Sequence, residues 1–166
     1  VGTTTNTFEV TDIHGNISSC SFFVTIHPTT TISIETTNVK CNGNADGIID
    51  ITVSTGTEPY SYSWSNSSIS EDLIGLDPGT YSVLVTDFNS CSVEASANIT
   101  QPEVLSMNAQ DNHVNCFNGD DGAIDIEVIG GTLPYSYIWS NGQTTQDANS
   151  LTSGDYDVTV TDSNNC

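Results

Sequence analysis

Apolar and polar residues alternate along most of the chain, and a two-residue period is the pattern of half-buried β-strands. The alternation predicts strands at residues 30–36, 47–54, 60–65, 79–87 and 92–99, separated by stretches rich in Gly, Pro and Asn. No segment of useful length carries the 3.6-residue apolar period of a helix. The pattern therefore predicts an all-β protein.

The alternating pattern occurs twice in the chain. A shift of 75 residues aligns Cys41–Cys91 with Cys116–Cys166 without a gap, and about half of the 51 positions are identical. Short strands in units of this length favour tandem immunoglobulin-like antiparallel β-sandwich domains in a linear array, each with seven strands. The matched blocks include Asp46-Gly47 with Asp121-Gly122, Pro59-Tyr60-Ser61-Tyr62 with Pro134-Tyr135-Ser136-Tyr137, and Gly79, Tyr81 and Val83 with Gly154, Tyr156 and Val158.

Three segments are expected from the repeat boundaries. Residues 1–28 read as the C-terminal hairpin of an incomplete preceding domain, with a turn at His14-Gly15-Asn16. Residues 29–101 form the first repeat and residues 102–166 the second. The first repeat continues beyond its second cysteine into the strand SVEASANI, so the second repeat is expected to lack its last strand.

Four aromatic residues are candidates for the core. Trp64 and Trp139 fall on a predicted central strand, where a sandwich buries its indole. Tyr81 and Tyr156 follow a glycine at the start of a late strand, which is the position of a tyrosine corner. A unit of this size needs its large aromatic side chains inside.

The charge balance excludes two classes of partner. Asp and Glu number 21, Lys40 is the only Lys or Arg, and the net charge is −20. Such a surface repels nucleic acid and anionic membranes, which bind through Lys and Arg. No apolar run approaches the roughly 18 residues of a membrane span, so no transmembrane segment is expected.

The repeat suggests a pairing for four of the five cysteines. Cys41 and Cys91 bracket one repeat and Cys116 and Cys166 bracket the next, which predicts one disulfide within each repeat and leaves Cys20 for an upstream cysteine. Closing a loop of about 50 residues would stabilise each repeat by about 4 kcal/mol. A zinc site is disfavoured because the CxxC spacing is absent. Disulfides indicate an oxidising compartment outside the cytoplasm.

The combined motifs carry a family resemblance. The pattern C-N-G-x-x-D-G-x-I-D-I-x-V, followed by G-T-x-P-Y-S-Y-x-W-S-N, L-x-x-G-x-Y-x-V-x-V-T-D and a closing Asn-x-Cys, resembles the SprB-type repeat of the giant surface adhesins of gliding Bacteroidetes. It covers residues 41–100 and 116–166. Residues 1–27 resemble the C-terminal end of a hyalin-repeat domain. The second repeat departs from the first at Phe117, which precedes Asn118-Gly119, so a different turn is expected there.

The resemblance implies a location and a set of partners. It implies export by the type IX secretion system to an extracellular, outer-membrane-attached cell surface. The implied partners are neighbouring repeats of the same chain, the secretion and gliding machinery, and an extracellular surface or polysaccharide. The implied role is a stalk segment of an adhesin used in gliding.

Recurring acidic residues are candidate calcium ligands, although no cofactor is certain. Asp46 and Asp50 recur as Asp121 and Asp125, and clustered carboxylates of this kind would bind calcium and rigidify the junctions between domains. NADGIID and GDDGAID do not fit the D-x-[DN]-x-[DN]-G loop, however, and Asp before Gly is ordinary turn chemistry.

The sequence favours a structural protein over an enzyme. His14, His27 and His113 do not recur between the repeats, so none is expected to be catalytic. The alternative is an accessory module of a secreted hydrolase that binds polysaccharide. The feature that supports this alternative is the strip of Tyr60, Tyr62 and Trp64, which the strand alternation places on one face.

Overall fold

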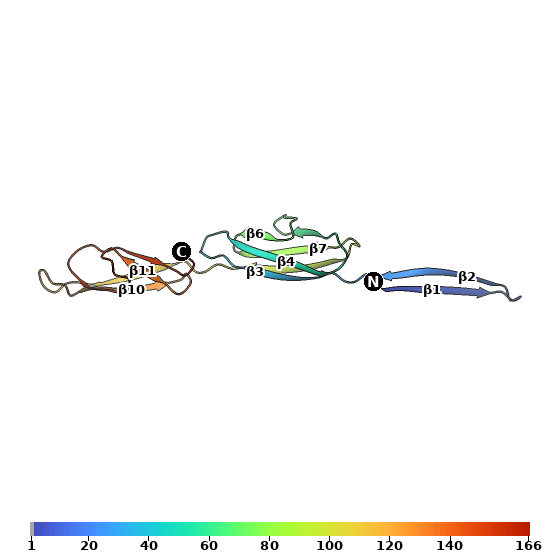
Figure 1. Cartoon of the computed structure of the whole chain (residues 1–166), viewed down its shortest axis with the longest axis horizontal. Helices are drawn as coiled ribbons and strands as arrows, with labels where there is room; N and C mark the ends of the chain where they lie inside the picture. Colours follow the sequence, from blue (N-terminus) through green and yellow to red (C-terminus); the bar gives the residue numbers. More distant parts are fainter. Residues whose placement is uncertain (1) are drawn as a thin grey trace. The chain divides into compact units, whose positions relative to one another are not determined.

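The computed structural model describes residues 2–166, and the regular secondary structure in that range consists of β-strands (Figure 1). The all-β prediction is therefore confirmed. Residues 2–166 contain no helix with the length and apolar character that crossing a membrane requires. Internal contacts divide the chain into two compact units, the first made of the residues up to Glu35 with Ile49–Leu73 and Tyr81–Ala97, and the second of Thr36–Ile48, Ile74–Thr80 and Asn98–Cys166.

The N-terminal segment is an antiparallel hairpin of β1 (Gly2–Thr11) and β2 (Ile17–Ile26), coloured blue in Figure 1. Asp12 organises its turn: Oδ1 accepts hydrogen bonds from the backbone N–H of His14 at 2.8 Å and of Asn16 at 2.9 Å. The Asn16 side chain also donates to Asp12, and these bonds lower the pKa of the Asp12 carboxyl. The assignment of this hairpin to a hyalin-repeat domain stays a prediction.

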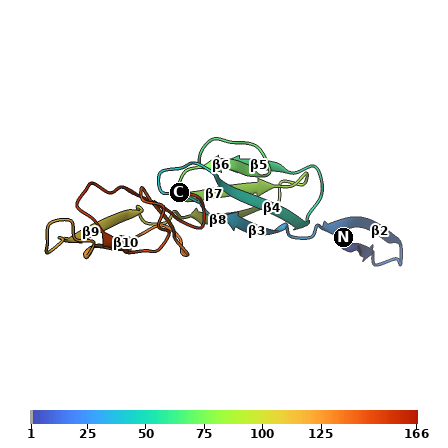
Figure 2. The same ribbon diagram turned by 60° about the vertical axis from the view of Figure 1, so that its left-hand side comes forward.

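The first repeat contains two three-stranded sheets. In one sheet β4 (Gly47–Thr55) lies between β3 (Thr31–Thr37) and β6 (Leu73–Leu76) (Figure 2). Within the described residues the repeat has six strands rather than the predicted seven, and β6 is one that alternation missed. In the other sheet β7 lies between β5 and β8, with bounds Ser61–Trp64 for β5, Gly79–Thr86 for β7 and Ser92–Ile99 for β8.

Strand β4 passes so close to β6 that only glycine fits at its start. A Cβ on Gly47 would lie 2.9 Å from the carbonyl oxygen of Leu76 and 2.7 Å from Cγ2 of Ile99. The alternating side chains of β4 then enter the core, which is the reason for its strict period of two. The buried apolar residues of this repeat are Val39, Ile49, Ile51, Trp64, Leu73, Leu76, Val83, Val85, Ala97 and Ile99.

The second repeat reproduces this arrangement. Strand β10 (Gly122–Ile129) lies between β9 (Ser106–Asn112) and β12 (Ala148–Leu151). In the other sheet β11 (Ser136–Trp139) pairs with β13 (Val158–Thr161). The starts of β9, β10, β11 and β12 each lie 75 residues after those of β3, β4, β5 and β6.

The core of the second repeat is less completely covered. Val158 and Val160 on β13 are half-buried, whereas the equivalent Val83 and Val85 on β7 are 2% and 0% exposed. The reason is the sheet order: β7 has a strand on both sides, whereas β13 pairs with β11 alone among the described residues. The cluster that remains buried is Ile126, Trp139, Ala148 and Leu151.

Candidate functional site

Each repeat opens with a tight turn around its first cysteine. In the first repeat the Asp46 carboxylate accepts a hydrogen bond from the backbone N–H of Lys40 at 3.1 Å. The N–H of Asn44 donates to the carbonyl oxygen of Cys41 at 3.1 Å, and Gly43 adopts a positive φ of 81°. Asp46 therefore acts as a turn cap that fixes how Cys41 is presented.

The second repeat forms the same turn, although a difference was expected after Phe117. Asp121 accepts from the backbone N–H of Asn115 at 3.1 Å, and Gly119 donates to the carbonyl oxygen of Cys116 at 2.9 Å. Asn118 takes the left-handed conformation with φ 57°, which Asn tolerates better than most side chains. The expectation of a different turn was wrong. Hydrogen bonds from the Asn115 side chain and backbone lower the pKa of Asp121.

The second repeat ends in a loop built around the Asp162 carboxylate. Its Oδ1 accepts from the backbone N–H of Asn164 at 2.8 Å and of Cys166 at 2.9 Å, and its Oδ2 accepts from the N–H of Thr132 at 2.8 Å. Asp162 is only 4% exposed. The bond from Cys166, with smaller contributions from Thr132 and Asn164, lowers the pKa of Asp162.

The first repeat carries the same loop around Asp87, which is 5% exposed. Asp87 accepts from the backbone N–H of Asn89 and Cys91, each at 2.9 Å, and from Thr57 at 3.1 Å. The Asn89 side chain donates to Oγ1 of Thr57 at 2.8 Å. The two loops thus present their cysteines on the same hydrogen-bonded frame.

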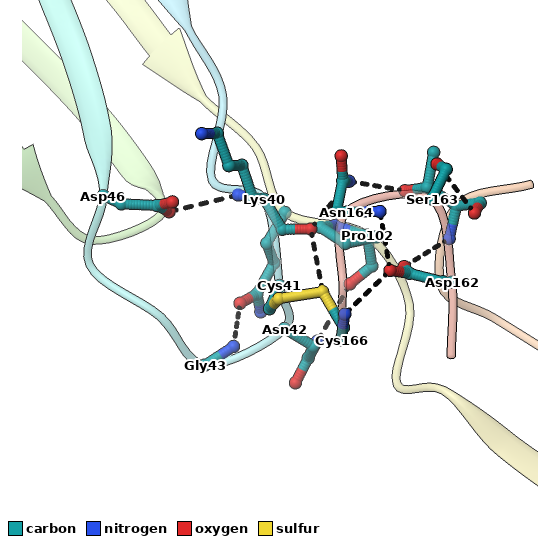
Figure 3. The surroundings of a disulfide bond; sticks show 12 residues. Lys40, Cys41, Asn42, Gly43, Asp46, Pro102, Asp162, Ser163, Asn164 and Cys166 are labelled. Atoms are coloured by element: carbon teal, nitrogen blue, oxygen red, sulfur yellow. Dashed lines mark hydrogen bonds between the residues drawn. A yellow bond between two sulfur atoms is a disulfide. The ribbon is translucent and has the colours of Figure 1, made fainter. Parts of the chain in front are cut away.

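A disulfide joins the opening turn of the first repeat to the closing loop of the second (Figure 3). Cys41 and Cys166 are bonded with their Cα atoms 5.7 Å apart, within the usual range, and 125 residues separate them. Both belong to the second compact unit. The Asn164 side chain donates to the carbonyl oxygen of Lys40 at 3.0 Å, so the loop also binds the residue before Cys41.

Further hydrogen bonds fix the residues around Cys41. The Asn42 side chain donates to the carbonyl oxygen of Pro102 at 2.9 Å, as Figure 3 shows. The N–H of Gly43 donates to Oε1 of Gln101 at 2.8 Å. The disulfide is therefore embedded in a polar junction, and the chemistry that this junction supports is covalent cross-linking.

This bond corrects the pairing that the sequence predicted within each repeat. Cys41 pairs with Cys166 rather than Cys91, and Cys91 and Cys116 are free thiols in the described structure, as is Cys20. The physical reason is the contact of the Asn164 loop with Lys40, which brings the second cysteine of the next repeat to Cys41. The repeat alone cannot show whether Cys41 pairs with Cys91 or with Cys166, because these two cysteines occupy equivalent positions.

The SprB repeat family model matches residues 33–68 and 112–144, segments that include both opening turns and both tryptophans. The chain carries two SprB repeats. No curated protein matches the chain.

The tryptophans lie in the cores of the SprB repeats. Trp64 and Trp139 are 4% and 3% exposed. Their indole N–H groups donate to the carbonyl oxygens of Ser70 at 2.8 Å and Thr145 at 3.0 Å. Because the polar atom of each ring is satisfied inside the repeat, the indoles are anchors of the fold.

The tyrosines of the SprB repeats lie at partly buried positions. Tyr156 is half-buried, and its hydroxyl donates to the carbonyl oxygen of Thr152 at 3.0 Å, the upstream bond of a tyrosine corner. Tyr81 is half-buried at the equivalent position. The Tyr62 hydroxyl donates to Glu71 at 2.8 Å, and burial together with this carboxylate raises the pKa of Tyr62 well above its usual value.

The proposed calcium ligands are not gathered into one site. Asp125 accepts a hydrogen bond from the Asn112 amide at 3.4 Å and Asp50 is exposed, while Asp46 and Asp121 cap their turns. Across residues 2–166, no group of three or more His, Cys, Asp or Glu side chains comes together as a metal site. Calcium at these positions stays a prediction.

The closing Asn-x-Cys belongs to the repeat pattern, but the hydrogen bonds of its Asn side chain to Thr57 in the first repeat and Thr132 in the second were not predicted from the sequence. Asn89 and Asn164 stand two residues after the loop aspartate and two before the cysteine, so both repeats share D-x-N-x-C. That shared motif was the signal, and it points to a structured cysteine loop rather than to a solvated turn.

Proposed function

We propose that this chain is a stalk segment of a large, secreted, repetitive cell-surface adhesin. The observation that carries the proposal is the Cys41–Cys166 bond, which couples two consecutive SprB repeats covalently. A module that only holds its own fold together has no need of a bond to its neighbour. A bond between repeats suits a chain whose purpose is to connect distant points.

Three further properties support a non-enzymatic stalk outside the cell. SprB repeats are typical of cell-surface proteins. The formal charge of −20 keeps such a segment soluble and disfavours non-specific association with other anionic surfaces. Disulfide bonds persist in oxidising compartments. Export by the type IX system, attachment to the outer membrane and a role in gliding are the finer parts of this proposal.

The polysaccharide-binding alternative loses its main support. A sugar platform needs aromatic faces in contact with water, whereas Trp64 and Trp139 are buried and hydrogen-bonded inside their repeats. The tyrosines beside them are half-buried. The adhesive surface is therefore expected in other parts of the protein.

The proposal is tested on whole bacteria that produce the protein. An antiserum raised against the chain is expected to label intact, unpermeabilised cells along surface filaments. Deletion of one 75-residue period from the gene should shorten these filaments while the remaining repeats stay on the surface. Labelling that requires permeabilisation, or repeats attached to a large catalytic domain, would refute the stalk.

A further inference from the structure

Two cysteines in the SprB repeats remain unpaired although each is held like a bonded one. Cys91 is half-buried and Cys116 is exposed, and both are free thiols in the described structure. Cys91 is the second cysteine of the first repeat, equivalent to Cys166. Cys116 is the first cysteine of the second repeat, equivalent to Cys41.

The loop of Cys91 matches the loop that binds the bonded partner. The N–H groups of Cys91 and Cys166 both donate at 2.9 Å to the loop aspartate, and Ser90 and Asn165 before them share a positive φ of 65° and 64°. The amide of Asn164 bridges its own Thr132 and the carbonyl oxygen of Lys40. Asn89 donates to Thr57 as Asn164 does to Thr132. The loop of Cys91 therefore has the shape that receives a segment like Lys40-Cys41.

The turn of Cys116 matches the turn that enters this loop. Lys40 and Asn115 precede the first cysteines, and each donates its N–H to the turn aspartate at 3.1 Å. The carbonyl oxygens of Cys41 and Cys116 each accept a hydrogen bond from the backbone N–H three residues later in the chain. The backbone that positions Cys41 for its bond is thus already formed around Cys116.

We propose that Cys116 is an attachment site for the second cysteine of a following SprB repeat, and that the loop of Cys91 is built to accept the first cysteine of another SprB repeat. The result is a staggered cross-link, in which the first cysteine of one repeat bonds to the second cysteine of the next repeat, as Cys41 does to Cys166. Each repeat is then bonded to its neighbour and not to itself. The partner is another SprB repeat, so this inference rests on the proposed repetitive stalk. Cys20 does not qualify, because it lies within strand β2 and outside any such turn or loop.

The bond forms by ordinary thiol–disulfide exchange. Two cysteine thiols lose two protons and two electrons as the S–S bond forms, and a disulfide oxidant, either a small-molecule disulfide or a disulfide-exchange protein, takes up the electrons and becomes two thiols. The exposure of Cys116 gives such an oxidant access.

A chain lengthened by one period tests the inference. Residues 92–166 are appended after Cys166, which supplies a third repeat and brings the number of cysteines from five to seven. Phe117→Tyr in the appended copy serves as a mass label at an exposed position. The chain is folded in a glutathione redox buffer, and its thiols are counted before and after unfolding.

Staggered cross-links leave three free thiols, whereas bonds within repeats leave one, because Cys20 has no partner in either scheme. Cleavage after glutamate places Cys20, Cys41, Cys91, Cys116 and Cys166 on separate peptides. We expect the Cys41 peptide joined to that of the original Cys166, and the unlabelled Cys116 peptide joined to that of the appended Cys166.

Three results would overturn the inference. They are a bond from Cys41 to Cys91, a bond from the labelled Cys116 copy to the appended Cys166, or an original Cys116 that stays reduced in the folded three-repeat chain. Replacing the appended Cys166 with Ser should raise the thiol count from three to four without changing the circular dichroism spectrum. A failure here would leave the surface labelling of the stalk intact, so the two proposals are tested separately.

Discussion

The backbone N–H of Cys166 donates to the carboxylate of Asp162 at 2.9 Å, so the charge of one buried side chain holds the loop that carries the disulfide. The same relationship links Cys91 to Asp87. An anion that accepts several backbone N–H groups stabilises its loop only while it is ionised, because protonation weakens it as an acceptor.

Acid should therefore loosen this loop. Hydrogen bonds place the folded-state pKa of Asp162 below its unfolded value of about 3.9, so its contribution is complete above that pH and is lost as the pH falls through the folded pKa. Asp162→Asn removes this titration. The difference in melting temperature between wild type and Asp162→Asn should shrink between about pH 6 and about pH 2. Asp155→Asn is the exposed control, and a difference that does not change with pH would contradict the prediction.

Loss of the inter-repeat disulfide should destabilise the chain. Cys41→Ser and Cys166→Ser are each expected to lower the free energy of unfolding by about 2–5 kcal/mol, because a long loop in the unfolded chain is no longer closed. The double variant should lose no more than either single one, since the same bond is removed. Urea denaturation measures the change.

The matched control for this bond is Cys91→Ser. It replaces a cysteine on an equivalent loop that has no disulfide in the described structure, so its midpoint should stay near that of wild type. A loss equal to that of Cys41→Ser would instead indicate a bond within the first repeat.

The buried indoles predict a fluorescence result. Acrylamide should quench Trp64 and Trp139 weakly in the folded chain and strongly after denaturation. Ile69→Trp places a third indole at an exposed position and should add a strongly quenched component. Strong quenching of the two natural tryptophans would reopen the sugar-platform hypothesis.

Trp139→Ala should lower the free energy of unfolding by about 3–5 kcal/mol, because it removes a large core side chain.

The close approach of neighbouring strands predicts the effect of an added methyl group. Gly47→Ala and Gly122→Ala would bring Cβ to 2.9 Å and 2.8 Å from the carbonyl oxygens of Leu76 and Leu151, and backbone atoms cannot easily move away. Each change should cost about 1–3 kcal/mol in thermal denaturation. Gly154→Ala, where the nearest neighbour is 3.9 Å away, should be nearly neutral. Equal melting temperatures for all three variants would contradict the proposed strand contact.

The long strands could be predicted from the sequence because their burial follows a strict period of two. Strand β4 alternates through Ile49 and Ile51, and the predicted range 47–54 differs from the structure by one residue. Strands β6 and β12 were not predicted, because each buries its first and fourth residues rather than every second one. Gly75 and Ser150 take a positive φ of 68° and 57° inside them and break the alternation.

The closing loops show a different limit of sequence reasoning. A repeat aligns equivalent positions but says nothing about which copy supplies the partner, and Cys41 has an equivalent choice in Cys91 and Cys166. The deciding contact is the hydrogen bond from Asn164 to the Lys40 carbonyl oxygen, which crosses 124 residues and leaves no local pattern.

The Cys41–Cys166 bond also determines how the chain responds to tension. A pulling force that enters before Cys41 and leaves at Cys166 passes through the two sulfur atoms and bypasses the 125-residue separation between them. The strands from β4 to β13, which lie between these two cysteines, can then separate from one another without lengthening the path. Reduction would release roughly 400 Å of extended backbone. A surface filament built in this way keeps its contour length under shear even where its domains yield.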